Sequence, residues 1–344
     1  MALLVKQKYL KSSISFLLFL LLLLLFPLTS HAVDLSYEVK PHLDPQSGKK
    51  GLDYFYSEVK PNETKTFSFD IINHSNSEAR FKVQLNRAVT NKNGFIDYSI
   101  QSKKKVPHDF NQMVNEREQE VTVPAQGKKE VTFTVKLPKQ KFQGIVLGGV
   151  YVTEINTASA KDASNSKSGI GFNQQLAYAM AVVLQEEVPY KGGSKVQLYK
   201  IQPTPNEAQA TLKLDMENIR PNILNNVSLK MKIYRSGEKS VYKTLQKQQM
   251  RFAPSDRFKL FIPWSAAEMK PGDYEVDIEV TSGQEKWLFK KKFSISKDDN
   301  ALLKAEGTPF AEEKSPSMII YWLLGLLAIT VIILVIIILR RKRK

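Results

Sequence analysis

The chain has 344 residues, of which 50 are Lys or Arg and 34 are Asp or Glu, and it contains no cysteine. The absence of cysteine excludes a disulfide scaffold and a cysteine nucleophile, so stability must come from buried cores. A formal net charge of +16 favours polyanionic partners. The lysine runs at 103–105 and 290–292 are too short to indicate a nucleic-acid-binding patch, and we expect no nucleic-acid partner.

The N-terminal segment, residues 1–32, has the organisation of a secretory signal peptide. Three lysines precede an apolar stretch from Phe16 to Leu28, and Ser30-His31-Ala32 is a small-x-small cleavage sequence. We therefore predict cleavage between Ala32 and Val33. The alternative is an uncleaved N-terminal anchor.

The following segment, 33–155, is predicted to be a β domain because apolar and polar residues alternate along it. Alternation places apolar side chains on one face of a strand, as in a half-buried antiparallel sheet. Turn sequences such as Asn91-Lys92-Asn93-Gly94 separate the strands. A short helix is favoured only within 107–118. Strands are predicted around residues 66–71, 81–85 and 131–137.

Three consecutive aromatic residues, Tyr54, Phe55 and Tyr56, are the candidate ligand-binding residues of this domain. In a strand, at least one of the three rings must face away from the core. An exposed ring beside polar groups suits the apolar faces and hydroxyls of sugars. The alternative is core packing, with Tyr54 and Tyr56 inside and Phe55 outside, or the reverse.

Residues 156–169 are small and polar, so we predict a linker or loop there and place the domain boundary in it. An alternative remains open, because the strand-like segment 172–186 could fold back onto 145–153 as a hairpin. The boundary would then move to about Pro189.

The segment 170–296 shows the same alternation and is predicted to be a second β domain. Its strands are expected around residues 212–216, 227–233 and 274–280. Many short strands separated by turn signals are typical of β-sandwiches. The predicted fold class is therefore all-β, with two tandem immunoglobulin-like β-sandwich domains.

The C-terminal part is predicted to comprise a polar stalk (297–317), a transmembrane helix (318–339) and a basic tail (340–344). Met318 to Leu339 contains no charge, and as a helix rising about 1.5 Å per residue it would span a bilayer core of about 30 Å. Tyr321 and Trp322 lie where amphipathic rings prefer the membrane interface. The tail, which begins with Arg340 and Arg341, is expected to stay in the cytoplasm.

The segment between signal and span, 33–317, is thus expected to lie outside the cell membrane. It contains all 34 acidic residues. Of the 50 basic residues, three lie in the signal peptide and five in the tail. With 42 basic residues remaining, its net charge is +8, which favours an anionic wall polymer or an acidic protein partner.

The sequence contains no recognisable catalytic constellation, and we predict that the protein is not an enzyme. His42, His74 and His108 remain after removal of the signal, without an HExxH or GxSxG motif. Several S-x-x-K matches lack the accompanying K-T-G. Glu186 and Glu187 would point to opposite faces of a strand, which suits neither acid–base work nor a metal site. We expect no metal and no cofactor.

Several segments of the sequence resemble those of a known protein family. The first β domain resembles the peptidoglycan-binding domain of the WxL-interacting proteins of Gram-positive bacteria, and the second resembles the host-binding domain of that family. The segments are YFYSEVKPNETKTFSFDIIN (54–73), AVTNKNGFIDYS (88–99), LPKQKFQGIVLGGVYVTE (137–154), FNQQLAYAMAVVLQE (172–186), MENIRPNILNNVSLKMKIY (216–234), MRFAPSDRFKLFIPW (250–264) and KPGDYEVDIEV (270–280).

The resemblance implies a membrane-anchored surface protein that binds peptidoglycan, associates with secreted WxL-domain proteins and supports attachment to a surface or to host extracellular proteins. It assigns no binding residue. The alternative is a chaperone or assembly factor for exported proteins, in which a client would add a strand to an exposed sheet edge.

Overall fold

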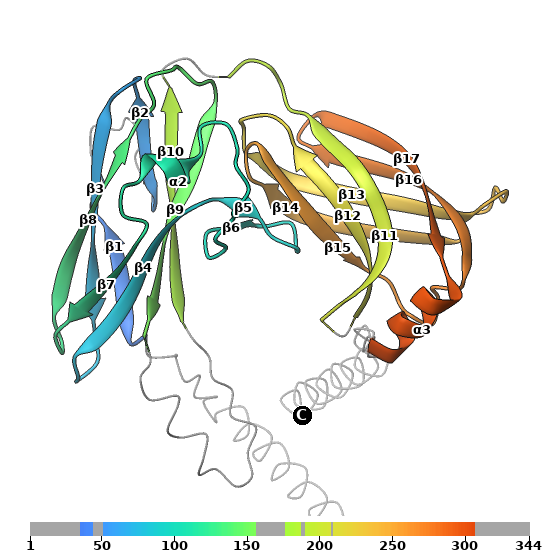
Figure 1. The fold of residues 1–344 in the computed structure, drawn as a ribbon, viewed down its shortest axis with the longest axis horizontal. Coiled ribbons are helices and arrows are strands. Elements are labelled where there is room, and N and C mark those ends of the chain that lie inside the picture. The colour runs from blue at the N-terminus through green and yellow to red at the C-terminus, as the bar shows by residue number, and fades with distance from the viewer. Residues whose placement is uncertain (1–34, 44–50, 156–175, 187–189, 208, 307–344) are drawn as a thin grey trace, which may run out of the picture.

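The computed structural model describes residues 35–43, 51–155, 176–186, 190–207 and 209–306, which form two packed β domains (Figure 1). The prediction of an all-β chain is confirmed for these residues. The predicted signal peptide, the linker 156–169 and the membrane helix with its tail lie outside the described residues. Among the described helices, none is long and apolar enough to span a membrane.

The first domain packs a three-stranded sheet, in the order β1-β3-β8, against a five-stranded sheet, in the order β2-β10-β9-β4-β7. All neighbouring strands are antiparallel except β2 and β10, which are parallel. The expected short helix is a single turn, α2 (Phe110–Met113). The strands are β1 (Tyr37–Pro41), β2 (Phe55–Val59), β3 (Thr64–Asn73), β4 (Ala79–Arg87), β5 (Val89–Thr90), β6 (Ile96–Asp97), β7 (Glu118–Val123), β8 (Lys128–Lys136), β9 (Ile145–Glu154) and β10 (Ala177–Glu186).

The core of this domain forms where the alternating apolar residues of the two sheets meet. Phe69 and Ile71 of β3 face Phe81 and Val83 of β4, and all four side chains are buried. Burying each such side chain contributes about 1.5–3 kcal/mol, which explains why strict alternation specifies these strands.

Strand β10 belongs to the first domain, although the sequence places it beyond the predicted linker. It pairs with β9 from Ala177↔Thr153 to Gln185↔Ile145 and with β2 on its other side. The hairpin alternative is therefore the arrangement observed. The boundary between the two domains therefore lies after β10, which ends at Glu186.

The second domain packs a three-stranded sheet, β11-β12-β15, against a four-stranded sheet, β14-β13-β16-β17. Its core runs from Leu198 through Trp264 to Ile295, all of them buried. The strands are β11 (Val196–Asn206), β12 (Gln209–Asn218), β13 (Leu224–Arg235), β14 (Lys243–Phe252), β15 (Asp256–Pro263), β16 (Gly272–Ser282) and β17 (Glu285–Ile295).

The first half of the predicted stalk is a helix, α3 (Lys297–Glu306), that packs against the second domain. Leu303 is fully buried in the core, and the Asn300 amide donates to the Met269 carbonyl. Ser296 accepts from the Asp299 N–H at 2.9 Å while the Asp299 carboxylate accepts from the Ser296 N–H at 3.0 Å, a reciprocal cap at the helix start. The expectation of a polar stalk over 297–317 is therefore wrong for residues 297–306.

Candidate functional site

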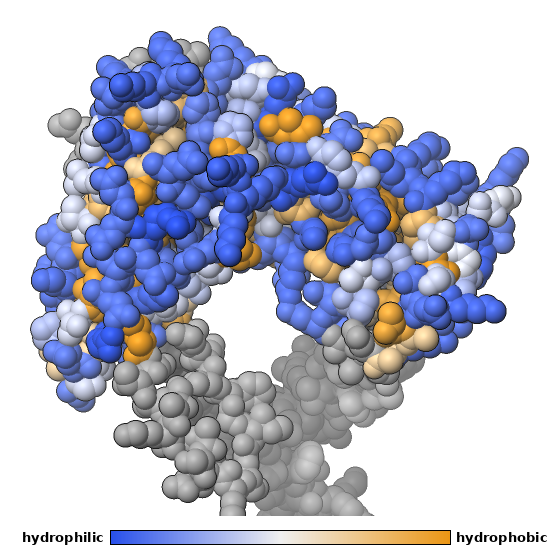
Figure 2. All heavy atoms as spheres, viewed as in Figure 1, coloured by the Kyte–Doolittle hydropathy of each residue, from blue (hydrophilic) through white to orange (hydrophobic). Residues whose placement is uncertain are grey.

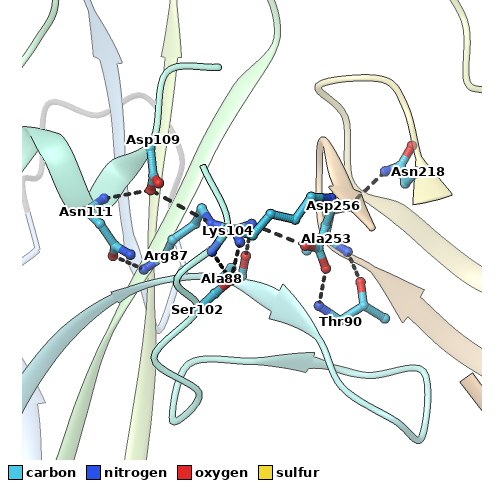
Figure 3. Close-up of polar contacts among 10 residues, drawn as sticks. All are labelled: Arg87, Ala88, Thr90, Ser102, Lys104, Asp109, Asn111, Asn218, Ala253 and Asp256. Atoms are coloured by element: carbon cyan, nitrogen blue, oxygen red, sulfur yellow. Dashed lines mark hydrogen bonds and ion pairs between the residues drawn. The ribbon is translucent and has the colours of Figure 1, made fainter. Parts of the chain in front are cut away.

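The two domains are joined by a buried ion pair, which Figure 3 shows in close-up. Arg87, at the end of β4, and Asp256, at the start of β15, are 4% and 2% exposed. The Arg87 Nη1 lies 3.2 Å from the Asp256 Oδ1, and the Asp256 Oδ2 accepts from the Thr90 N–H at 2.6 Å. One carboxylate of the second domain thus holds both a side chain and the backbone of the first.

Further polar groups of the first domain hold the Arg87 guanidinium in place. Its Nη2 donates to the Ser102 Oγ at 2.8 Å, and its Nε lies 3.8 Å from the Asp109 carboxylate. Asp109 also caps α2 by accepting from the Asn111 N–H at 3.0 Å. A buried pair is costly to break because the remaining charge stays desolvated, so this network fixes how the domains meet.

A hairpin of the first domain closes one open side of the second sandwich. The turn between β5 and β6 reaches the edges of β14 and β15 (Figure 1). The Arg251 N–H of β14 donates to the Gly94 carbonyl at 2.8 Å, and the Phe261 N–H of β15 donates to the Lys92 carbonyl at 3.0 Å. Both strand edges therefore find hydrogen-bond acceptors on the other domain.

Gly94 is the tightest point of this contact. Its φ of +81° lies in the left-handed region, and a Cβ there would fall 2.6 Å from the Met250 Sδ and 3.2 Å from the Leu260 Cδ1. Only glycine fits both the backbone conformation and the space. The turn itself is held by the Asn91 side chain, which accepts from the Asn93 and Phe95 N–H groups.

The outer face of the five-stranded sheet is covered at one end and open at the other. Tyr98 lies against Gly149 of β9, and its carbonyl accepts from the Asn86 amide at 2.8 Å. Burial raises the pKa of Tyr98 to about 12. The outer face of the sheet continues from Gly149 to Tyr151 and on toward Glu154, the last residue of β9.

The open end presents one half-buried aromatic ring among small and polar groups. Tyr151 is directly opposite Ala179 of β10 and Gln84 of β4, and the exposed alanine has no side chain that could cover the ring. The Gln84 amide and the Lys82 ammonium bind the Glu118 carboxylate at 2.9 and 2.7 Å. Their interaction, chiefly that of Lys82, holds the pKa of Glu118 below its usual value. This open sheet face therefore combines an aromatic surface with amide, ammonium and carboxylate groups.

The four-stranded sheet of the second domain presents a striped outer face. A row of acidic residues on β16 lies between rows of lysines on β13 and β17. The β17 lysines form ion pairs with the acidic residues at 2.6 to 3.3 Å. Leu288 interrupts the β17 row and is 70% exposed. The residues of this striped face are Lys230, Lys232, Glu275, Asp277, Glu279, Lys286, Leu288, Lys290 and Lys292.

The part of the molecule seen in Figure 2 is mostly hydrophilic and is hollowed between the domains.

The predicted aromatic site does not form an exposed platform. Phe55 is buried in the first-domain core against Phe67 and Phe133, with ring centroids 5.2 and 5.8 Å apart. Tyr56 is buried on the opposite face of the sheet, in a cluster that includes Ala253 of the second domain. Tyr54 is half-buried and packs against both clusters. The rings of Phe55 and Tyr56 are therefore inaccessible to a sugar, which corrects that prediction.

The other predicted site residues lie outside the described part of the chain. They are Ala32 and Val33 at the cleavage site and Met318, Tyr321, Trp322, Leu339, Arg340 and Arg341 at the membrane anchor. Within the described residues, no group of three His, Asp or Glu side chains is placed to hold a metal ion. His42, the histidine with most acidic neighbours there, contacts Asp70 and Glu130 on an exposed sheet face.

The fold described above is that of a two-domain all-β protein. The family model for the peptidoglycan binding domain of WxL Interacting Protein matches residues 37–154, and the model for its host binding domain matches residues 167–303. The chain therefore belongs to the WxL-interacting protein family, and its two domains occur in the order predicted from the sequence. The match to the host binding domain begins at residue 167, before β10. The boundary between the two folded domains lies after β10, because β10 pairs in the sheet of the first domain.

No curated protein matches the chain. Similar solved structures include a chaperone–tip adhesin complex of CFA/I fimbriae (10% identity, 74% of this chain and 98% of that chain, TM-score 0.29), the class 5 fimbriae chaperone CfaA (10%, 74% and 99%, 0.28) and the Pseudomonas aeruginosa CupB2 chaperone (9%, 67% and 93%, 0.27).

Proposed function

We propose that the chain is a non-enzymatic cell-surface protein that binds peptidoglycan and associates with WxL-domain surface proteins, supporting attachment to a surface or host. In this proposal, the signal is removed after Ala32, the helix 318–339 anchors the chain, and the tail 340–344 is cytoplasmic. The observation that carries the proposal is the ordered match to the family's peptidoglycan-binding and host-binding domains across 37–303.

The open sheet face is the surface of the first domain best suited to a glycan. A sugar ring stacks its apolar face on an aromatic ring and directs hydroxyls to polar neighbours. Tyr151 offers such a ring because Ala179 leaves it uncovered, and Gln84 and Lys82 offer donors beside it. This assignment replaces Tyr54, Phe55 and Tyr56.

The striped face is the surface of the second domain that we assign to a protein partner. Alternating charge rows can select one register of a partner with complementary charges, and exposed Leu288 adds an apolar contact on the edge strand β17. Its ion pairs are exposed, so they contribute specificity rather than domain stability.

Strand-edge pairing, as expected of a chaperone, is not favoured by the second domain. The hairpin covers the edges of β14 and β15. Of the other two edge strands, β17 carries Lys286, Lys290 and Lys292, and β11 contains Pro203 and Pro205. Edge lysines and prolines discourage the addition of a further strand. The partner is therefore assigned to a sheet face.

Two substitutions test the division of binding between the surfaces. In the segment 33–317, Tyr151→Ala should reduce sedimentation with purified peptidoglycan at least fivefold and leave capture of a WxL-domain protein unchanged. Tyr234→Ala is the matched control, because it removes another half-buried strand tyrosine, on β13. Equal losses in the two variants would contradict the assignment of the glycan to the open sheet face. Leu288→Lys should show the reverse behaviour, with weaker capture and unchanged sedimentation.

The membrane arrangement has its own test. Deleting 318–344 should convert a membrane-bound protein into a soluble secreted one whose first residue is Val33. Fractionation and N-terminal mass spectrometry measure both properties. Retention of the deleted form in the membrane, or an uncut N-terminus, would contradict the proposed topology.

A further inference from the structure

A pocket of about 290 Å³ opens where the two domains meet, close to the ion pair of Arg87 and Asp256. The first domain contributes apolar walls from Val106, Phe110 and Phe142, and the second contributes the turn containing Arg220 and Pro221. The volume is near the lower end of the range for small-ligand sites, about 300–1,000 Å³. The pocket therefore suits the end of a chain molecule rather than a long stretch of it.

The turn that carries Arg220 is held rigidly by both domains. The Ser255 N–H donates to the Arg220 carbonyl at 3.0 Å, and the Ile145 N–H of the first domain donates to the Pro221 carbonyl at 2.8 Å. Gly144, with φ +84°, allows this approach, because any Cβ there would collide with the Pro221 carbonyl. The position of Arg220 is thus fixed by the junction.

The two arginines in the pocket differ in their partners. Arg87 is bound by the Asp256 carboxylate and lies beside Asp109, so its charge is compensated within the protein. The Arg220 side chain is half-buried, and its Nε, like that of Arg87, is buried without a hydrogen-bond partner. Unlike Arg87, it forms no ion pair with a carboxylate of the described residues. A buried donor without an acceptor is unfavourable, and a bound anion would supply the acceptor.

The surroundings of Arg220 narrow the chemistry of that anion. A guanidinium presents a planar fork of donors that matches the two oxygens of a carboxylate. Val106, Phe110 and Phe142 form an apolar wall, and the His108 ring packs on Phe142 with centroids 5.4 Å apart. Gln143, Tyr190 and Ser255 add polar groups to the lining. A carboxylate attached to a small apolar residue fits this combination better than a phosphate in a hydrophilic polymer.

We propose that the junction pocket binds the terminal D-alanyl carboxylate of a peptidoglycan stem peptide, with Arg220 as the carboxylate anchor. The proposal rests on the proposed function, because it names the part of peptidoglycan that a second site recognises. Both domains build the pocket, so recognition of the stem peptide requires the junction to be intact.

The test uses the full chain in detergent micelles and a soluble probe, diacetyl-Lys-D-Ala-D-Ala, in a titration followed by calorimetry. We expect binding of the free acid, and at least tenfold weaker binding of its C-terminal amide, because the amide lacks the charge that pairs with Arg220. Arg220→Gln should weaken binding of the acid at least tenfold. It should leave the thermal midpoint unchanged, since the buried Nε has no hydrogen-bond partner to lose.

Two controls separate the pocket from general charge and from general wall binding. Arg251→Gln removes an exposed guanidinium that donates to the Asn225 side chain outside the pocket, and it should leave probe binding unchanged. Val106→Phe fills the pocket without removing a charge and should abolish probe binding.

Several results would overturn the proposal. These are equal binding of acid and amide, unchanged binding by Arg220→Gln, equal binding of an L-Ala-L-Ala probe, or tighter binding of glycerol phosphate. If any of these occurs while the full chain still sediments with peptidoglycan, the pocket assignment fails and the proposed function stands. Failure of the full chain to sediment would instead contradict the proposed function.

Discussion

Replacing Gly94 by alanine should destabilise the second domain, although Gly94 belongs to the first. Alanine at φ +81° costs about 1–2 kcal/mol in backbone conformation. Its Cβ would also fall 2.6 Å from the Sδ and 2.9 Å from the Cγ of Met250, a fully buried side chain. Overpacking of this kind costs about 1–3 kcal/mol, so the total is about 2–5 kcal/mol.

The chain offers a closely matched control for the backbone part of this cost. Gly237, in the turn after β13, has φ +84°, and a Cβ built there meets nothing within 4 Å. Gly237→Ala should therefore show the conformational cost of about 1–2 kcal/mol alone. The difference between the two variants isolates the packing of the hairpin against β14 and β15.

Tryptophan fluorescence during urea unfolding of the segment 33–317 provides the assay. Trp264 and Trp287 both lie in the second domain, and Trp322, the third in the chain, is outside this segment. The signal thus reports second-domain unfolding alone, while circular dichroism reports both domains. We expect Gly94→Ala to lower the fluorescence midpoint further than Gly237→Ala does. An equal or smaller shift would refute the reasoning that the hairpin completes the second sandwich.

Two more predictions concern the junction and the covered sheet face. Asp256→Asn leaves the Arg87 guanidinium buried without its main partner. It should lower the free energy of unfolding, measured by urea titration, by about 3–5 kcal/mol. A loss below about 1 kcal/mol would contradict the conclusion that this ion pair fixes how the domains meet. Burial raises the pKa of Tyr98 to about 12 from an ordinary value near 10. The folded state then holds the proton more tightly, so stability is complete below pH 10 and falls as the pH rises toward 12. Tyr98→Phe should lose less stability over this interval, and parallel curves for variant and wild type would count against this burial.

The strands themselves were predictable because each has one buried face. Phe67, Phe69 and Ile71 alternate with polar residues, and the core requires that register. The pairing of the strands was not predictable in the same way, because alternation does not indicate which strand lies next to which. β10 pairs with β9, although the residues between them in the sequence have the composition of a linker. A fragment ending at 155 would lack this interior strand of the five-stranded sheet.

The surfaces were harder to predict than the cores, because the second domain changes what is exposed on the first. Tyr56 points away from the first-domain core, as alternation requires, yet Ala253 and its neighbours bury it. Asn91 to Gly94 reads correctly as a turn, but no local signal shows that it docks on Met250. The sequence also shows nothing special at Tyr151, which we propose as a glycan-stacking residue because Ala179, 28 residues further along the chain, lies opposite it.

Sedimentation of the segment 33–317 with peptidoglycan stripped of teichoic acids tests the central claim most directly. Exposed charges are screened within about 8 Å at physiological ionic strength and more strongly at higher salt. Generic attraction of this basic segment should therefore vanish in about 0.5 M salt, whereas stacking on an aromatic ring with direct hydrogen bonds should persist. We expect a substantial bound fraction at that salt concentration. A segment that stays in the supernatant, or that sediments only at low salt, would contradict specific peptidoglycan binding.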